Sequence, residues 1–301
     1  MKSEEFKSYL KSERAKNFIS PFNLVYQAFC HLGYDKQPAQ FFKNNASEIV
    51  IALRAKCWEE FVPKEAEFTS RVLCSLIDDK NVNAQKSKEA IIDFVYKYSS
   101  HLYELFLSNT QSRRSRAGKE FEAIIELLIA GAQIPVDTQG VVGKKNFEEK
   151  NLGKLVDFVS PGVIEYASNK QDSVLISAKT TLRERWQEVP EEITRTCIPQ
   201  MYLATLDDSI SDQTLQILYD ANVIVVTTKS NKLINYSKNN RVKTFEELIQ
   251  IMEDKAKLWS SYEYSDEENM FKSNLLLAQM DKYKNISFVE NYYKKRFDIL
   301  K

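Results

Sequence analysis

Three side chains in the middle of the chain, Asp157, Lys179 and Glu192, could together bind a metal ion and activate water. Asp157 lies in the alternating stretch 154–159, which predicts a strand, and an unpaired carboxylate would be costly to bury there. The apolar, β-branched run 174–176 predicts a second strand that ends at Lys179. Two carboxylates and an amine on neighbouring elements form a set that can hold Mg²⁺.

A charged segment follows Lys179 directly. Residues 182–188 predict the start of a helix whose first turn carries Arg183, Glu184 and Arg185. Because arginines at a helix N-terminus oppose the helix dipole, they would be better placed if a polyanion or base edges neutralised them. The alternative is a solvated charged face, which is what charge runs usually form. A lysine at a strand end followed by these arginines would place a catalytic residue directly before residues that read DNA.

The composition is that of an ordinary soluble globular protein. Its 301 residues suit one large domain or two modest ones, with 28% charged and 43% hydrophobic residues. The 42 basic and 42 acidic residues cancel, but DNA binding depends on a local basic face and not on the total charge. Two basic clusters flank the candidate site: Arg113, Arg114, Arg116 and Lys119 in one, and Arg183, Arg185 and Arg195 in the other.

Several classes of site and protein are disfavoured. The four cysteines form no CxxC pair and the chain has only two histidines, which argues against zinc, a disulfide framework and histidine-based triads. The segment 140–145 lacks the length and the Ser or Thr of a phosphate-binding loop. No apolar run approaches the roughly 20 residues of a membrane span, and no signal peptide is apparent. We therefore expect a cytoplasmic protein with no membrane partner.

The order of elements predicts a helical part followed by a mixed α/β core. Apolar spacing predicts helices through most of residues 1–108, and the polar basic stretch 111–116 reads as a connector before a helix at 117–130. Residues 131–153 are rich in glycine and predict loops. Beyond them we expect strands near 154–159, 173–179, 200–205 and 222–228, helices between them and at 243–258, and a helical tail at 266–299.

Three sequence segments together resemble a known family. They are residues 115–119 (Ser-Arg-Ala-Gly-Lys) with Glu122, the pair Val156-Asp157, and residues 177–186 (Ser-Ala-Lys-Thr-Thr-Leu-Arg-Glu-Arg-Trp) with Glu192. This combination resembles type II restriction endonucleases of the SsoII/EcoRII/PspGI/NgoMIV group, and most of all the SsoII-like enzymes. The resemblance is strong over residues 110–200 and weaker towards the N-terminus.

The resemblance implies a restriction-endonuclease-like (PD-(D/E)xK) fold of the α/β class. Its mixed central sheet is flanked by helices, and a helical N-terminal region precedes it. The implied division is a DNA-binding region at residues 1–108 and a catalytic core with a helical C-terminal tail at residues 109–301.

The chain departs from the widespread nuclease pattern of Pro-Asp followed by Asp/Glu-x-Lys. Val156 precedes Asp157, and Ser177 stands where the second acid is usual. The resemblance implies that Glu192 replaces that acid, so that Asp157 and Glu192 hold Mg²⁺ and Lys179 lies near the attacking water. Glu122 is a candidate further ligand, through a water or a second metal; the alternative is a solvated helix glutamate.

The resemblance also implies which residues read DNA. Arginine pairs bidentately with guanine and glutamate accepts from cytosine, and in the resembling enzymes the triplet at Arg183, Glu184 and Arg185 reads the CCGG-type core. Gln111 matches the position that contacts the outer C:G pair; the alternative is an ordinary loop glutamine.

Arg54 and Trp58 lie four apart on one face of a predicted helix. In SsoII-like enzymes an Arg and a Trp at this spacing sandwich a central nucleotide flipped out of the duplex. Because stacking on an aromatic ring tolerates any base, a CCGG reader that removes the middle nucleotide can accept CCNGG. The alternative makes Trp58 a core residue with Arg54 on the surface.

The function predicted from these residues and this resemblance is Mg²⁺-dependent cleavage of double-stranded DNA at a CCNGG palindrome. A two-fold target implies a homodimer, and the family implies 5′ overhangs. A higher assembly on DNA is left open. The alternatives are a DNA-binding regulator without cleavage, a nuclease or nickase without sequence specificity, and the same nuclease acting on CCWGG or CCGG.

Overall fold

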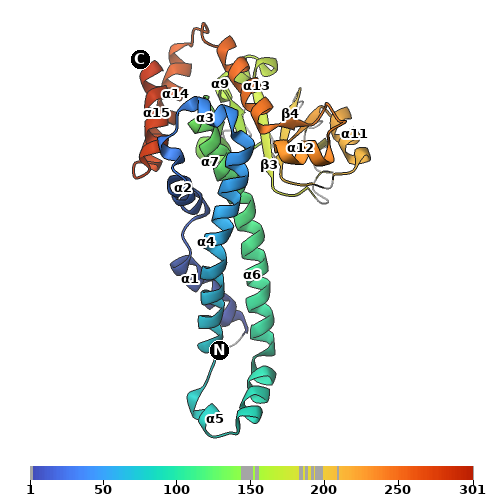
Figure 1. The fold of residues 1–301 in the computed structure, drawn as a ribbon. Helices are drawn as coiled ribbons and strands as arrows, with labels where there is room; N and C mark the ends of the chain where they lie inside the picture. Colours follow the sequence, from blue (N-terminus) through green and yellow to red (C-terminus); the bar gives the residue numbers. More distant parts are fainter. Residues whose placement is uncertain are drawn as a thin grey trace. The chain divides into compact units, whose positions relative to one another are not determined.

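The chain forms two compact units in the computed structural model (Figure 1). The first comprises Met1–Ala28 and Arg54–Glu120, and the second Phe29–Leu53 and Phe121–Lys301. These units are structural, whereas the predicted division at residue 108 concerns function, and it stays a prediction. The structure describes residues 3–143, 152, 156–182, 186, 189–190, 193, 199–208 and 210–300.

In the second unit, the described residues form a six-stranded mixed sheet. The strands follow one another in chain order across it, β1-β2-β3-β4-β5-β6. β1 pairs antiparallel with β2 and β2 with β3, whereas β3, β4, β5 and β6 run parallel. Their bounds are Asp137–Thr138, Phe158–Ser160, Val174–Lys179, Met201–Thr205, Val223–Thr227 and Lys243–Thr244.

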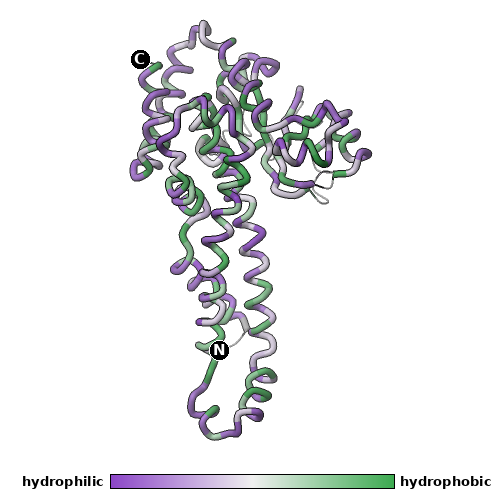
Figure 2. Tube along the Cα trace, in the orientation of Figure 1, coloured by the Kyte–Doolittle hydropathy of each residue, from purple (hydrophilic) through white to green (hydrophobic). Residues whose placement is uncertain are grey.

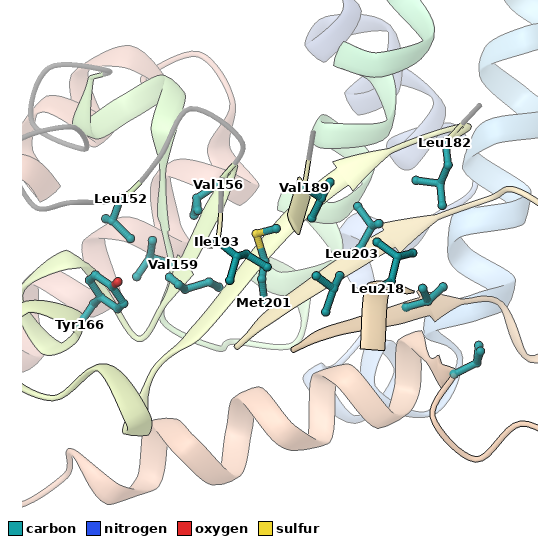
Figure 3. Packing of buried hydrophobic residues seen from close by; sticks show 14 of the residues in the cluster. Leu152, Val156, Val159, Tyr166, Leu182, Val189, Ile193, Met201, Leu203 and Leu218 are labelled. Atoms are coloured by element: carbon teal, nitrogen blue, oxygen red, sulfur yellow. The ribbon is translucent and has the colours of Figure 1, made fainter. Parts of the chain in front are cut away.

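The central strands are buried on both faces. Every residue of β4, and all but one of β3 and of β5, has a buried side chain. Near-continuous apolar runs of this kind are expected of parallel strands that are covered on both sides. Figure 3 shows part of the resulting core, with Val159, Met201 and Leu203 among the labelled residues. Leu175 and Val225 belong to the same hydrophobic cluster.

Helices and short 3₁₀ turns complete the second unit. α13 contacts β2, β3 and β5, and it begins with a capping box in which Thr244 and Glu247 satisfy each other's backbone N–H groups. The bounds are Tyr34–Lys36 for η1, Ala39–Asn44 for α3, Gln139–Val142 for α7, Val163–Ser168 for α9, Lys170–Asp172 for η2, Asp212–Asp220 for α11, Lys229–Asn235 for α12, Phe245–Leu258 for α13, Asp266–Lys282 for α14 and Ser287–Leu300 for α15.

The C-terminal helices are held to the rest of the second unit by ion pairs that are mostly buried. On α15, the Arg296 guanidinium donates to the Val136 carbonyl at 2.6 Å and pairs with Asp137 at 3.4 Å. On α14, Lys272 pairs with Glu165, a carboxylate that is only 2% exposed. Because breaking a buried pair leaves an uncompensated charge, these contacts hold α14 and α15 in place. The predicted helical tail is thus part of this unit.

The first unit consists of helices. They are α1 (Ser3–Asn17), most of α2 (Pro21–His31), α5 (Asp79–Asn83) and long parts of α4 (Ala46–Cys74) and α6 (Ser87–Gly131). Hydrophilic and hydrophobic residues alternate along α4 and α6 in Figure 2, as expected of helices with one apolar face. Buried residues of α4, α6 and α1 form a core together with Leu76, which follows α4; the members are Phe6, Leu10, Phe68, Val72, Leu76 and Leu105. No helix in the described ranges has the length and apolarity needed to cross a membrane.

The structure corrects two predicted elements. Residues 111–116 are not a connector, because α6 runs through them without a break. The stretch has no Gly or Pro, and Arg116 pairs with Glu120 one turn later at 3.2 Å, which supports a helix. The first predicted strand begins at Phe158, so Asp157 lies directly before it and not in its middle. The strands near 173–179, 200–205 and 222–228 are confirmed.

Candidate active site

Asp157 and Lys179 lie side by side at the edge of the sheet where β2 begins and β3 ends. The antiparallel register pairs Phe158 with Ile176, and the Asp157 N–H donates to the Ile176 carbonyl at 2.9 Å. This places Asp157 beside Ser177, and Lys179 follows two residues later on the same face of β3. The Lys179 ammonium is 3.2 Å from Asp157 Oδ2. The structure therefore brings these two predicted site residues together.

The Asp157 carboxylate is mostly buried, with 13% of the side chain exposed, and its two oxygens have different surroundings. Burial raises its pKa, although Lys179 and the Ala178 N–H act in the opposite direction. The Ala178 N–H donates to Oδ2 at 2.7 Å, and Lys179 contacts the same oxygen. Within the described part of the chain, Oδ1 accepts no hydrogen bond. A mostly buried carboxylate with one oxygen that accepts no hydrogen bond is suited to bind a cation, which would compensate its charge.

Ser177 lies at the position on β3 where the widespread nuclease pattern has its second acid. Its hydroxyl lies 3.5 Å from Asp157 Oδ2, at the limit of a hydrogen bond. A carboxylate at this position would stand beside that of Asp157, whereas the serine adds no charge. The site therefore needs a further carboxylate from another segment if it is to hold a divalent ion.

Several predicted site residues fall outside the described residues: Arg183, Glu184, Arg185 and Glu192. Glu122 lies on α6 and is partly exposed. Within the described ranges, no group of three or more His, Cys, Asp or Glu side chains could hold a metal ion. The roles of Glu192 as second ligand and Glu122 as further ligand stay predictions.

Asp207 is a residue that the sequence reasoning missed. It follows β4, and its Oδ2 accepts the Leu182 N–H at 2.9 Å, directly before the segment with Arg183. Its own carbonyl accepts from Asn231 at 3.0 Å. A signal was present, because residues after parallel strands, at their carboxyl ends, are where α/β proteins place functional groups. Asp207 thus fixes the backbone at Leu182, which precedes Arg183 in the sequence.

Arg54 and Trp58 both lie on α4, within the first unit. The Trp58 side chain is 46% exposed, so it is not a core residue. The Arg54 guanidinium pairs at 3.0 Å with Glu120, whose side chain is only 5% exposed and which also pairs with Arg116. Burial raises the pKa of Glu120, while the two arginines lower it. Because Glu120 lies between two guanidinium groups, it fixes Arg54 one helical turn from the exposed ring of Trp58.

A second arginine stands over Trp58. The Arg113 guanidinium lies 5.6 Å from the ring centroid, within cation–π range, and its Nε donates to the buried Glu65 at 2.6 Å. Arg54 and Arg113 are therefore each held by a buried glutamate close to the same indole. Gln111 lies nearby in sequence on α6 with an exposed side chain. Its surface position leaves it available for contact with a partner.

The chain is similar to known proteins over nearly its whole length. The family model described as "EcoRII C terminal" matches residues 79–249. The type II restriction enzyme SsoII of Shigella sonnei is 54% identical over 296 residues, which cover 98% of this chain and 97% of that enzyme.

Solved structures give a matching result. Metal-depleted Ecl18kI in complex with uncleaved DNA superposes with a TM-score of 0.93 at 52% identity, covering 99% of this chain and 100% of that one. The restriction endonuclease PspGI in complex with substrate DNA has a TM-score of 0.61 at 16% identity, covering 81% of this chain and 95% of that one. At this identity the PspGI likeness concerns the fold alone.

Proposed function

Since this chain belongs to the type II restriction endonucleases, which are site-specific deoxyribonucleases, we propose that it cleaves both strands of DNA at CCNGG with Mg²⁺ as cofactor. The predicted restriction-endonuclease-like fold is confirmed by the likeness to Ecl18kI. The observation that carries the catalytic assignment is the Asp157–Lys179 pair, which lies where β2 begins and β3 ends.

The metal ion would be held by Asp157 and Glu192, with Glu122 as a candidate further ligand. The open Oδ1 of the buried Asp157 supports this assignment, because a carboxylate oxygen is the ligand that Mg²⁺ prefers. When bound, the ion supplies charge stabilisation at the scissile phosphate and lowers the pKa of water.

The chain's own residues orient and stabilise the reacting groups. Lys179 holds a positive charge 3.2 Å from Asp157 Oδ2, next to where the phosphate would lie. An ammonium fixed in a partly buried position can stabilise the negative charge that develops on phosphate oxygens without reorganisation during the reaction. The Ala178 N–H donates to Oδ2 and so holds the Asp157 carboxylate in one orientation.

Base reading is assigned to Arg183, Glu184 and Arg185, with Gln111 at the outer C:G pair. We expect Arg185→Ala or Arg183→Ala to lose about 1–3 kcal/mol of discrimination, because each substitution removes one bidentate contact to guanine. The measurement is the ratio of dissociation constants for a CCNGG duplex and a duplex with one G:C pair replaced. A ratio unchanged from wild type would remove that arginine from the reader.

The flipped central nucleotide is assigned to Arg54 and Trp58. The exposure of Trp58 and the fixed guanidinium of Arg54 support this proposal. We expect Trp58→Ala to weaken binding by about 1–3 kcal/mol, the usual effect of losing a base–aromatic stack. A duplex with 2-aminopurine at the central position reports this directly, since unstacking from neighbours changes its fluorescence on binding.

The control for that experiment is Tyr103→Ala. Tyr103 is an aromatic side chain on α6 that is 66% exposed and that the proposal leaves out of base contact. It should leave the 2-aminopurine signal as in wild type. If the central base stays stacked in the wild-type complex, the flipping proposal fails and contiguous CCGG becomes the simpler target.

A homodimer follows from a palindromic target, which needs one catalytic site on each strand. We retain residues 1–108 as the DNA-binding region and residues 109–301 as the catalytic core. The mass of the protein on a single-site duplex, compared with the mass of the free protein, tests the dimer and detects any higher assembly on DNA.

Incubation of plasmid DNA with the purified protein, with and without Mg²⁺, tests the function. Discrete fragments that appear only with Mg²⁺ support the proposal. Bound but uncut DNA would instead indicate a regulator, and nicked circles or a smear would indicate a nuclease without sequence specificity.

A further inference from the structure

A cavity of about 610 Å³ lies in the first unit, between α1 and α6. Gln111 of α6 lines it, and α1 contributes Lys7, Lys11 and Arg14. The catalytic assignment uses none of these α1 residues. The cavity therefore places an unassigned group of cations beside a residue proposed to contact the target.

The lining carries a marked excess of positive charge. Arg116 is the fourth cationic residue, and Glu104 is the one acid among the described residues that line the cavity. Glu104 is already paired with Lys7 at 3.4 Å. Lys11 is exposed and has no ion-pair partner in the part of the chain that the structure describes. An anion entering this cavity would thus meet uncompensated charge.

Arg14, which lines the cavity, has one donor that is not used within the described residues. Its Nε donates to Ser108 at 3.0 Å and its Nη2 to Asn109, but Nη1 is buried with no hydrogen-bond partner among the described residues. Burial lowers the pKa of this arginine, because a charged group is disfavoured there. Arg14 therefore carries a charge with no ion-pair partner among the described residues, and an anion in the cavity would compensate it.

The α6 wall adds neutral donors at helical spacing. Ser108, Ser112 and Ser115 line the cavity at intervals of four and three residues, so their hydroxyls share one face of α6 with Gln111. Lysine, arginine, serine and glutamine side chains are the usual contacts to phosphate oxygens of DNA. The wall offers this chemistry in a row that follows the helix.

We propose that this cavity binds backbone phosphates of duplex DNA that flank the target sequence. Lys11 and Arg14 supply the charge, and the serines of α6 supply hydrogen bonds to the phosphate oxygens. The proposal rests on the proposed function, because Gln111 brings the duplex to this face. Such contacts add affinity without base specificity.

The test is the salt dependence of binding by Lys11→Gln. Because the proposed homodimer loses one phosphate contact in each subunit, the slope of log Kobs against log salt should become shallower by about 1.8, and binding should weaken about sixtyfold near 0.1 M salt. The loss should be equal for target and non-target duplexes. Because Lys11 is exposed, this substitution leaves the core of the unit untouched.

Lys16→Gln is the matched control. Lys16 lies on the same helix but outside the cavity, and it pairs with Glu13 at 2.9 Å. It should keep the wild-type slope and affinity. If Lys11→Gln also keeps them, the phosphate site is overturned.

A second arm uses duplexes whose flanking linkages are neutral methylphosphonates. Wild type should bind them more weakly than ordinary duplexes, and Lys11→Gln should show a smaller difference between the two. An equal difference in both proteins would contradict the proposal. Should wild type cut CCNGG plasmids while the Lys11→Gln slope is unchanged, only this inference falls; should wild type neither bind nor cut DNA, both it and the proposed function fall.

Discussion

Replacement of Asp157 by asparagine should reduce DNA cleavage on the order of 10³-fold or more while leaving binding to the target nearly unchanged. Asparagine keeps the size of the side chain and an oxygen that can accept the Ala178 N–H, so the local structure should persist. It removes the negative charge on which metal binding depends. Because burial already disfavours the charge of Asp157, the neutral variant should fold at least as readily.

The measurement is single-turnover cleavage of a CCNGG duplex at saturating protein, with binding followed separately in the absence of Mg²⁺. Asp281→Asn is the control, since that side chain is 82% exposed on α14. It should cleave at the wild-type rate. Wild-type turnover in Asp157→Asn would remove Asp157 from the site.

Replacement of Lys179 by methionine should slow cleavage by about 10²–10³-fold. Methionine has nearly the same length but no charge, so the substitution tests the ammonium 3.2 Å from Asp157 and not the packing of β3. Since Lys179 is not assigned as a metal ligand, the Mg²⁺ concentration that gives half-maximal cleavage should move much less than in Glu192→Gln.

That comparison separates charge stabilisation from metal binding. Lys170→Met is the control, because Lys170 lies outside the site on η2. Unchanged turnover in Lys179→Met would show that the ammonium has no part in the chemistry. An equal shift of the Mg²⁺ midpoint in Lys179→Met and Glu192→Gln would instead contradict the separate roles of the two residues.

The central strands could be predicted because their apolar runs are local features of the sequence. The segments at 174–179, 201–205 and 223–227 are buried on both faces, and each reads as a strand by composition alone. β1 and β6 have two residues each and owe their assignment to a partner strand. A pairing of that kind depends on register and not on local pattern.

The stretch 111–116 was wrongly predicted from its local composition. Its polar, basic composition is typical of a connector, yet tertiary contacts make it helical: Arg113 donates to the buried Glu65, and Arg116 donates to the Ile19 carbonyl at 2.9 Å. Helix propensity is a weak prior that such contacts override. The sequence marks these arginines as charged but not as partners of buried glutamates.

In the candidate site, the proximity of Asp157 and Lys179 could be predicted because each belongs to or adjoins a recognisable apolar strand, although Asp157 was placed within its strand and not directly before it. The role of Asp207 could not be predicted, since its contact with the Leu182 N–H joins segments 25 residues apart. Hydrogen bonds between loops at the edge of a parallel sheet follow from topology. Only the order β3-β4-β5, which the chain's local pattern leaves open, brings these loops together.

The most direct test of the account is to sequence the ends of fragments from a plasmid that carries CCNGG with each of the four central bases. The account predicts cleavage of all four sites in the presence of Mg²⁺, with five-nucleotide 5′ overhangs that start at the first C. Cutting at CCWGG alone, cutting at contiguous CCGG, or no discrete ends at any CCNGG site would contradict it.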